Sequence, residues 1–204
     1  MARELCAQCN RPLSACWCHC RLLIDNQVEV GILQHPTEQK QVKSTVPLLL
    51  SCLQKQSAWV GEQIADTQLL AGTDISLQEW LDNPKTTYLL YPATEDENIT
   101  VVEAKQLQES AQQIQVLVLD GTWRKTFKML QLNPVLQRLP RISIRPQQAS
   151  QYSIRKQKDE GSLSTIEAVG QLLTEAENQP EITEKLNQAF ICFQEAVFPY
   201  VKKS

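Results

Sequence analysis

The sequence contains no long hydrophobic stretch, no internal repeat and no low-complexity linker. A membrane-spanning helix needs about 18–20 consecutive apolar residues, and no window of the chain approaches that length. The first residues, MARELCAQC, also lack the apolar region of a secretory signal. We therefore expect a cytoplasmic protein that does not enter membranes and whose thiols are reduced.

An overall excess of positive charge is absent as well, because the 204 residues carry a net charge of −3. The charge is unevenly distributed, however. Residues 120–160 contain nine Lys and Arg against three acids, whereas the remainder has eleven bases and twenty acids. Two interpretations stay open: a basic face that binds phosphates, or a solvated surface whose charges pair with acidic helices nearby.

Short apolar segments alternate with helical patterns after residue 22. Strands are expected at 28–34, 86–92, 115–120 and 141–145, and helices at 45–53, 101–113, 123–131, 164–177 and 181–197. Residues 59–81 show no regular pattern, and Ser164 with Glu167 matches a capping box. Apolar strands separated by helices predict an α/β fold with a mostly parallel sheet, in which ligands bind beyond the carboxyl ends of strands.

The N-terminal 22 residues are rich in cysteine, and five of the seven cysteines of the chain fall within fifteen residues. Their spacing is Cys6-x-x-Cys9 followed by Cys16-x-Cys18-x-Cys20. Four thiolates on such turns can surround a tetrahedral ion, and zinc suits four sulfurs in a reducing compartment. We predict a structural zinc knuckle over residues 1–22 with the ligands Cys6, Cys9, Cys16 and Cys18.

Other roles for the cysteines are less expected. His19 and Cys20 remain alternative ligands of the ion. Disulfides are disfavoured in a reducing compartment. Cys52 and Cys192 lie on apolar helix faces, and we expect both to pack in the core.

The segment Val116–Leu130 changes from a buried strand to a basic helix across Asp120, Gly121, Thr122 and Trp123. Asp120 would lie at the carboxyl end of the strand, where an active-site cleft forms. Gly121 permits a close backbone approach or a positive φ angle, and Thr122 can cap the following helix. The alternative is an ordinary N-cap turn followed by a core tryptophan.

Several short motifs together resemble the DTW-domain family, whose members are tRNA-uridine aminocarboxypropyltransferases. They are CAQCNRPLSACWC at the N-terminus, LQHPTEQK at 33–40, LDGTW at 119–123, YSIR at 152–155 and LSTIEAV at 163–169. The resemblance covers nearly the whole chain, and the motifs stand in the order typical of that family. Lys43-Ser44-Thr45 departs from an Asn-Thr pair of many relatives, so no role is transferred there.

The resemblance implies a SPOUT-like fold over residues 23–204 and leaves open whether the chain is knotted. It also implies that S-adenosylmethionine binds in loops at the carboxyl edge of the sheet. The reaction would transfer the 3-amino-3-carboxypropyl group to N3 of a tRNA uridine and release 5′-methylthioadenosine. The partner would be tRNA, and a monomer is favoured although the sequence does not determine the oligomeric state.

The matched motifs give three sets of candidate residues. The catalytic candidates are Asp120, as general base or as electrostatic partner of the sulfonium, and Trp123, as support of the loop rather than as a stacking surface. The expected cofactor-binding residues are Leu90, Tyr91, Pro92, Leu119, Gly121, Thr122, Leu163, Ser164, Thr165, Glu167 and Ala168. The expected RNA-binding residues are Arg124, Lys125, Lys128, Arg141, Arg145, Tyr152, Arg155 and Lys156. His35 either orients a substrate group or serves the structure.

Two other functions compete with this one. A SAM-dependent RNA methyltransferase would use the same kind of fold and donor. A zinc-knuckle protein that binds RNA without catalysis would explain the cysteines and the basic segment, but it would leave the carboxylate of LDGTW without a role.

Overall fold

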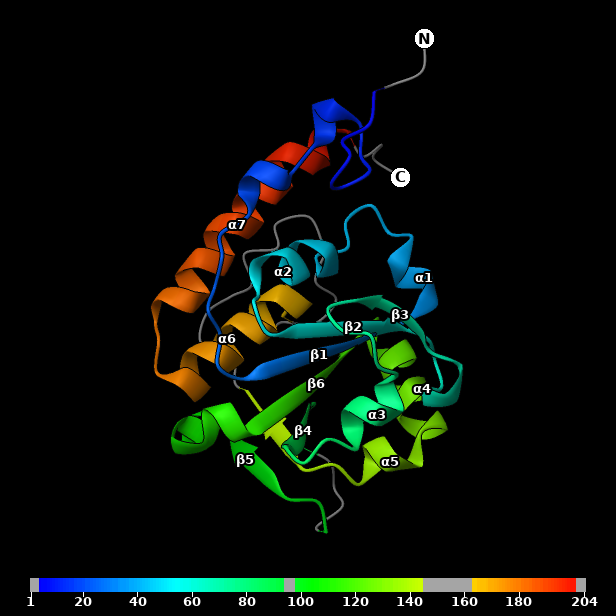
Figure 1. Ribbon diagram of the computed structural model, residues 1–204, viewed down its shortest axis with the longest axis vertical. Coiled ribbons are helices and arrows are strands. Elements are labelled where there is room, and N and C mark those ends of the chain that lie inside the picture. Colours follow the sequence, from blue (N-terminus) through cyan, green and yellow to red (C-terminus); the bar gives the residue numbers. More distant parts are fainter. Residues whose placement is uncertain (1–3, 94–97, 145–162, 201–204) are drawn as a thin grey trace.

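The computed structural model describes residues 4–93, 98–144 and 163–200, which form one central sheet with helices on both faces (Figure 1). The strand order is β3-β2-β1-β6-β4-β7-β5. The strands are β1 (Glu29–Gln34), β2 (Gln56–Val60), β3 (Gln68–Ala71), β4 (Thr86–Leu90), β5 (Val101–Glu103), β6 (Ile114–Asp120) and β7 (Arg141–Ser143). Only β3 runs antiparallel to its neighbour in this sheet. The predicted α/β fold with a mostly parallel sheet is confirmed.

The helices separate into two layers. They are α1 (Pro36–Gln39), α2 (Val46–Cys52), α3 (Leu77–Leu81), α4 (Trp123–Leu132), α5 (Pro134–Gln137), α6 (Thr165–Glu177) and α7 (Glu181–Val197). Helices α2, α6 and α7 cover one face of the sheet, and α3, α4 and α5 cover the other (Figure 1). In the described ranges, no helix is both long and apolar enough to cross a membrane.

The central strands β1 and β6 are buried along almost their whole length because helices cover both of their faces. Alternate residues of each strand enter opposite cores. Val30 and Val116 pack with the α2, α6 and α7 layer, whereas Leu33 and Leu117 pack with the α3, α4 and α5 layer. This two-sided burial explains why the strands appear in the sequence as continuous apolar runs.

Some predicted elements were wrong or missed. The segment 59–81, which has no periodicity, contains the end of β2, the edge strand β3 and the short helix α3. The helix expected at 101–113 is strand β5 followed by a 3₁₀ helix over Ala104–Gln113. The helices expected at 164–177 and 181–197 are confirmed, and Ser164 and Glu167 form the predicted capping box.

The expectation of reduced thiols holds for five of the seven cysteines but is wrong for Cys20, which forms a disulfide with Cys192 of α7. The two residues are 172 positions apart in the sequence, so no local pattern could have paired them. Cys192 is thus a bonding partner as well as a packing residue, whereas Cys52 is a buried free thiol, as expected. The disulfide fastens the end of the N-terminal segment to the last long helix.

Gly31 in β1 provides the space that the buried Trp80 ring of α3 occupies. A Cβ atom at residue 31 would lie 2.7 Å from Cη2 of Trp80, closer than real contacts allow. We expect Gly31→Ala to destabilise the protein by about 1–3 kcal/mol because the core must shift to relieve the overlap. Thermal denaturation should show a fall in Tm of roughly 2–12 °C.

Gly170 of α6 offers a matched control for this substitution. A Cβ atom there would lie 3.3 Å from a terminal methyl carbon of Leu186, which can rotate away, and alanine favours a helix interior. Gly170→Ala should therefore lower Tm less than Gly31→Ala. If both variants melt alike, the close approach of Trp80 does not explain why residue 31 is glycine.

Candidate active site and metal centre

The carboxylate of Asp120 lies at the carboxyl end of β6, beside the end of β1. Gln34 of β1 pairs with Asp120 in the sheet, and its Nε2 donates a hydrogen bond to Asp120 Oδ2 at 2.9 Å. The hydroxyl of Thr165, the first residue of α6, donates to the other oxygen, Oδ1. Gln34 also donates to the Ser44 hydroxyl at 3.1 Å. Asp120 is therefore held in one orientation by donors from two distant segments.

His35 follows Gln34 and has a structural environment. It is 6% exposed, and its backbone N–H donates to the Asp120 carbonyl at 2.9 Å. The backbone N–H of Thr37 donates to Nδ1, which caps α1 and places the proton of the neutral ring on Nε2. Nε2 donates to Glu62 at 2.6 Å. Of the two roles open for His35, these contacts favour the structural one.

Two of the lysines expected to bind RNA form ion pairs within the protein. Lys125 contacts Glu38 at 2.6 Å, and Lys128 contacts Glu62 at 2.6 Å. Hydrogen bonds from Lys128 and from His35 lower the pKa of the Glu62 carboxyl below its ordinary value. These pairs fasten α4 to the segments that follow β1 and β2, so the two lysines contribute to the position of α4.

The turn between β6 and α4 differs from its expected form. Gly121 does not need a positive φ, because Gly72 is the one glycine in the described ranges that has it. A Cβ at Gly121 would instead lie 3.2 Å from Cβ of Lys125 and 3.6 Å from Cβ of His35. The glycine thus lets α4 approach β1 closely. Thr122 occupies the N-cap position of α4, but its side chain makes no capping hydrogen bond.

Trp123 begins α4 and is 54% exposed. Its ring meets the edge of the Tyr91 ring, with centroids 6.0 Å apart. This exposure contradicts the core tryptophan of the alternative interpretation. Support of the loop stays a prediction, and the contact with Tyr91 is compatible with it. The exposed ring is free to contact a ligand.

Arg141 was expected at the RNA-binding surface, but it is 1% exposed in strand β7. Its guanidinium carbon lies 5.3 Å above the centroid of the Tyr91 ring, and Nη2 donates to the Gln137 carbonyl at 3.4 Å. Burial lowers the pKa of Arg141 below its ordinary value. Arg141 supports Tyr91 from within the protein and does not belong to a surface that binds phosphates.

The residues predicted around the cofactor come from three loops at one edge of the sheet. Leu90 ends β4, which lies beside β6, and Tyr91 follows it; Thr165 joins α6 to Asp120. Ser164 and Glu167 bond to each other in the capping box. Leu119 packs its side chain in the core, so its predicted ligand contact can come only from backbone atoms.

Gln34 and Glu62 are site residues that the sequence analysis missed. A polar residue that ends an otherwise apolar strand was the available signal for Gln34. Glu62 offered no such signal, because its partners His35 and Lys128 are remote in the sequence. Arg145, Tyr152, Arg155 and Lys156 lie outside the described residues.

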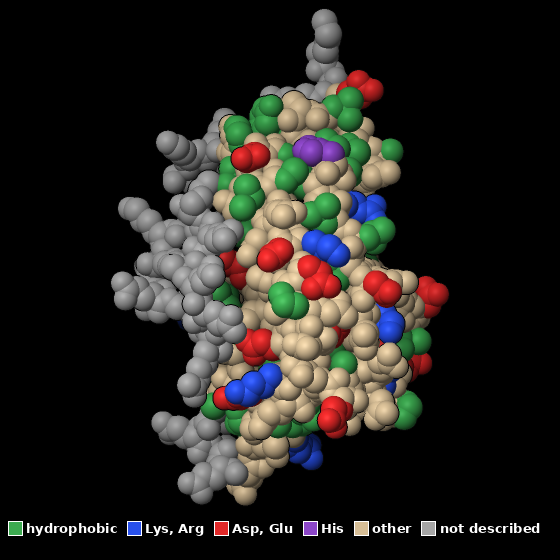
Figure 2. Space-filling view, turned by 90° about the vertical axis from the view of Figure 1, so that its left-hand side faces the viewer, with side chains coloured by type: hydrophobic (Ala, Val, Ile, Leu, Met, Phe, Trp, Pro, Cys, Tyr) green, Lys and Arg blue, Asp and Glu red, His purple; other side chains and the backbone are tan. Residues whose placement is uncertain are grey.

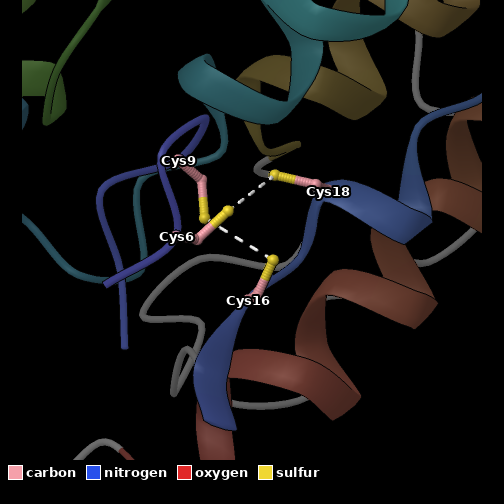
Figure 3. A group of neighbouring side chains, drawn as sticks. All are labelled: Cys6, Cys9, Cys16 and Cys18. Carbon is pink, nitrogen blue, oxygen red and sulfur yellow. Dashed lines mark hydrogen bonds between the residues drawn. The ribbon is translucent and has the colours of Figure 1, made fainter. Parts of the chain in front are cut away.

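The four predicted metal ligands come together at the N-terminus. Cys6, Cys9, Cys16 and Cys18 point their sulfur atoms toward one another, and all four atoms lie within 4.8 Å of each other (Figure 3). The sulfurs of Cys6 and Cys18 are 3.8 Å apart, and those of Cys9 and Cys16 are 3.9 Å apart. Sulfurs bound to one tetrahedral zinc are about 3.8 Å apart. Cys20 is bonded to Cys192 instead, so it is not a spare ligand.

The thiols of this cluster influence each other's ionisation. Backbone N–H groups of Cys9 and Gln8 lower the pKa of Cys6 to about 6. Burial and the neighbouring sulfurs raise the pKa of Cys18 to about 12. Once one thiolate has formed, its negative charge opposes the ionisation of the neighbouring thiols. A divalent cation would offset this repulsion. The donor set therefore fits a metal ion.

Comparison with known proteins identifies the family of the chain. The sequence model of the DTW domain family matches residues 3–198 of the chain. The chain belongs to the DTW domain family. No solved structure matches the chain.

The curated relatives carry one kind of name. The chain is 32% identical over 190 residues to tRNA-uridine aminocarboxypropyltransferase 2 of Drosophila melanogaster, a match that covers 90% of this chain and 71% of that protein. It is 28% identical over 201 residues to the Macaca fascicularis protein of the same name, covering 94% of this chain and 64% of that one. It is 24% identical over 205 residues to tRNA-uridine aminocarboxypropyltransferase A of Arabidopsis thaliana, covering 90% and 76%. The chain thus spans less than two thirds of the macaque relative's length.

The family motifs that are far apart in the sequence converge in space. The LQHP segment provides Gln34 and His35, LDGTW provides Asp120, and LSTIEAV provides Thr165. Gln34, His35 and Thr165 each form a hydrogen bond with Asp120. This DTW-domain chain therefore has a polar centre built around one carboxylate at the carboxyl edge of the sheet.

Proposed function

We propose that this chain transfers the 3-amino-3-carboxypropyl group of S-adenosylmethionine to N3 of a uridine in tRNA. A bond forms between N3 and the γ-carbon of the donor, the bond from that carbon to sulfur breaks, and 5′-methylthioadenosine leaves. The N3 proton passes to a base or to solvent. The observation that carries the proposal is the match to the DTW domain over nearly the whole chain, together with relatives named for this activity.

Asp120 is the residue proposed to act nearest the reacting atoms. Both of its oxygens already accept hydrogen bonds, from Gln34 and from Thr165. These donors hold the carboxylate in place and reduce its capacity to accept another proton. The arrangement favours an electrostatic role, in which the negative charge faces the sulfonium or the amino group of the donor, over a role as general base.

The remaining predicted donor-binding residues surround this carboxylate. S-Adenosylmethionine, when bound, supplies an electrophilic carbon next to a sulfonium, and the protein must select one of three such carbons by position. Tyr91 offers an aromatic surface at the rim, and Pro92, Gly121 and Thr122 offer backbone atoms. Leu163 precedes the N-cap residue of α6, and Ala168 lies one turn into that helix.

The wider features of the proposal follow from the family. We propose a SPOUT-like catalytic domain over residues 23–204, a zinc knuckle over residues 1–22, and tRNA as the macromolecular partner. The cytoplasm remains the predicted location, and a monomer remains the favoured state.

The deciding experiment is mass spectrometry of tRNA nucleosides after incubation with the protein and S-adenosylmethionine. Aminocarboxypropyl transfer adds about 101 Da to uridine, whereas transfer of a methyl group from the same donor adds about 14 Da. A product heavier by about 14 Da would establish the competing methyltransferase. Absence of any product, with tRNA bound, would favour the non-catalytic RNA-binding protein.

A further inference from the structure

Helix α4 exposes two large aromatic side chains on one face. Trp123 is 54% exposed and Phe127 is 57% exposed. Residues four positions apart are neighbours on a helix surface, so the two side chains project from the same side of α4. The buried residues of α4 are Thr126, Met129 and Leu130, which pack the helix onto the molecule. Neighbouring exposed aromatic rings are unusual on a protein surface and indicate a binding site.

This surface is held in place before any partner arrives. The Tyr91 ring contacts Trp123 edge to face, and the guanidinium of the buried Arg141 lies over the Tyr91 ring. Lys125 and Lys128 fasten the flank of α4 through their ion pairs. A rigid aromatic surface binds without a large cost in side-chain ordering.

The chemistry around the rings indicates the kind of partner. Arg124, one position after Trp123, is exposed on α4, and Arg138, which follows α5, is exposed as well. Aromatic faces that alternate with guanidinium groups suit unpaired nucleotides, whose bases stack on rings and whose phosphates bind arginine. Trp123 is also only three residues from Asp120, so the surface begins at the rim of the candidate active site.

The other side of the molecule lacks this combination. Figure 2 faces the side covered by α6 and α7, where Asp and Glu side chains are interspersed with Lys and Arg and no continuous basic patch is visible. Ile191 of α7 is 46% exposed, and residues 187 and 195, one turn away on either side, are not aromatic. Single exposed hydrophobic residues of this kind are normal.

We propose that Trp123, Phe127 and Arg124 form a stacking surface for unpaired nucleotides of the RNA substrate next to the modified uridine. The inference rests on the proposed function, because it assigns the surface to the substrate of that same site. A base on the Trp123 ring would lie nearest Asp120, and the next base would lie on Phe127. Stacking would hold the loop open and leave the uridine edge free to react.

The test is the substitution Phe127→Ala in the full-length protein, with Phe127→Tyr as the variant that keeps an aromatic ring. Stacking contributes about 1–3 kcal/mol per base, which corresponds to roughly a 5- to 150-fold change in affinity. We expect Phe127→Ala to raise KM for tRNA by about that factor, with a smaller effect on kcat and none on KM for S-adenosylmethionine. Phe127→Tyr should have a KM for tRNA close to that of the wild type, and Ile191→Ala on α7 should leave this KM unchanged.

A second measurement does not depend on catalysis. A fluorescently labelled single-stranded oligouridine should bind the wild type, and Phe127→Ala should weaken that binding by a similar factor. When the same oligonucleotide is annealed to its complement, the wild type and Phe127→Ala should bind it with equal affinity. Unchanged oligonucleotide affinity in Phe127→Ala overturns the stacking surface, even if transfer activity is present. If the wild type transfers nothing but the oligonucleotide difference holds, the proposed reaction fails and the surface stands.

Discussion

Asp120→Asn is expected to slow aminocarboxypropyl transfer by about 10²- to 10⁴-fold, the range found when a catalytic carboxylate or a preorganised charge is removed. Asparagine has nearly the same shape as aspartate, so the β6–α4 turn should keep its conformation. Its amide loses the negative charge, however, and its NH₂ group would face one of the donors from Gln34 and Thr165. Single-turnover assays with labelled donor and saturating tRNA measure the loss directly.

The pH dependence of the Asp120→Asn variant separates the two roles of the carboxylate. If Asp120 removes the N3 proton, the variant should recover at alkaline pH, where uridine loses that proton without help. If the carboxylate instead stabilises the positively charged donor, the variant should stay slow at every pH relative to the wild type. The hydrogen bonds to both oxygens favour the second result, and a recovery at alkaline pH contradicts it.

Two further variants show whether the effect belongs to this carboxylate. Thr165→Val removes one donor to Asp120 but keeps the shape of the side chain, and the loss of one hydrogen bond to a charged group should slow transfer by roughly 10- to 100-fold. Asp74→Asn changes an exposed carboxylate in a loop and should have no effect. If Asp120→Asn transfers at the wild-type rate, the carboxylate has no part in the reaction.

The fold was predictable where burial leaves a pattern. The strands β1 and β6 are covered on both faces, so their apolar runs identified them, and the capping residues Ser164 and Glu167 located the start of α6. Strand β3 was not predictable because its residues at the sheet edge are partly or fully exposed. Strand β5 contains three residues, too few to show an alternation.

The site was predictable only in part for a related reason. Asp120 stands at the end of a recognisable strand, and the cysteine spacing is local, so both were visible in the sequence. The donors Gln34 and Thr165 lie 86 and 45 positions from Asp120, and only the fold brings them together. The burial of Arg141 and the Cys20–Cys192 disulfide likewise depend on contacts between distant segments.

Cys16→Ser is expected to abolish zinc binding and to loosen the packing of the N-terminal knuckle on α7, to which the Cys20–Cys192 disulfide still tethers it. Three sulfurs hold zinc more weakly than four, so the metal content should fall from about one ion per chain to near zero. The knuckle carries Trp17, which is 6% exposed and packs edge to face on Phe193 of α7. Uncovering this contact should cost about 3–5 kcal/mol, as truncation of a buried tryptophan does. Atomic emission and thermal denaturation, with a fall in Tm of roughly 6–20 °C, check both effects.

Two cysteine variants distinguish loss of a ligand from loss of any thiol. Cys52→Ala removes a buried thiol outside the cluster and should keep the full metal content. Cys192→Ser removes the disulfide that ties the knuckle to α7, but neither Cys192 nor Cys20 belongs to the four-sulfur group, so zinc should again be retained. A chelator added to the wild type should reproduce the lower Tm of Cys16→Ser. If Cys192→Ser loses its zinc instead, the ion is held beside α7 and the four assigned ligands are wrong.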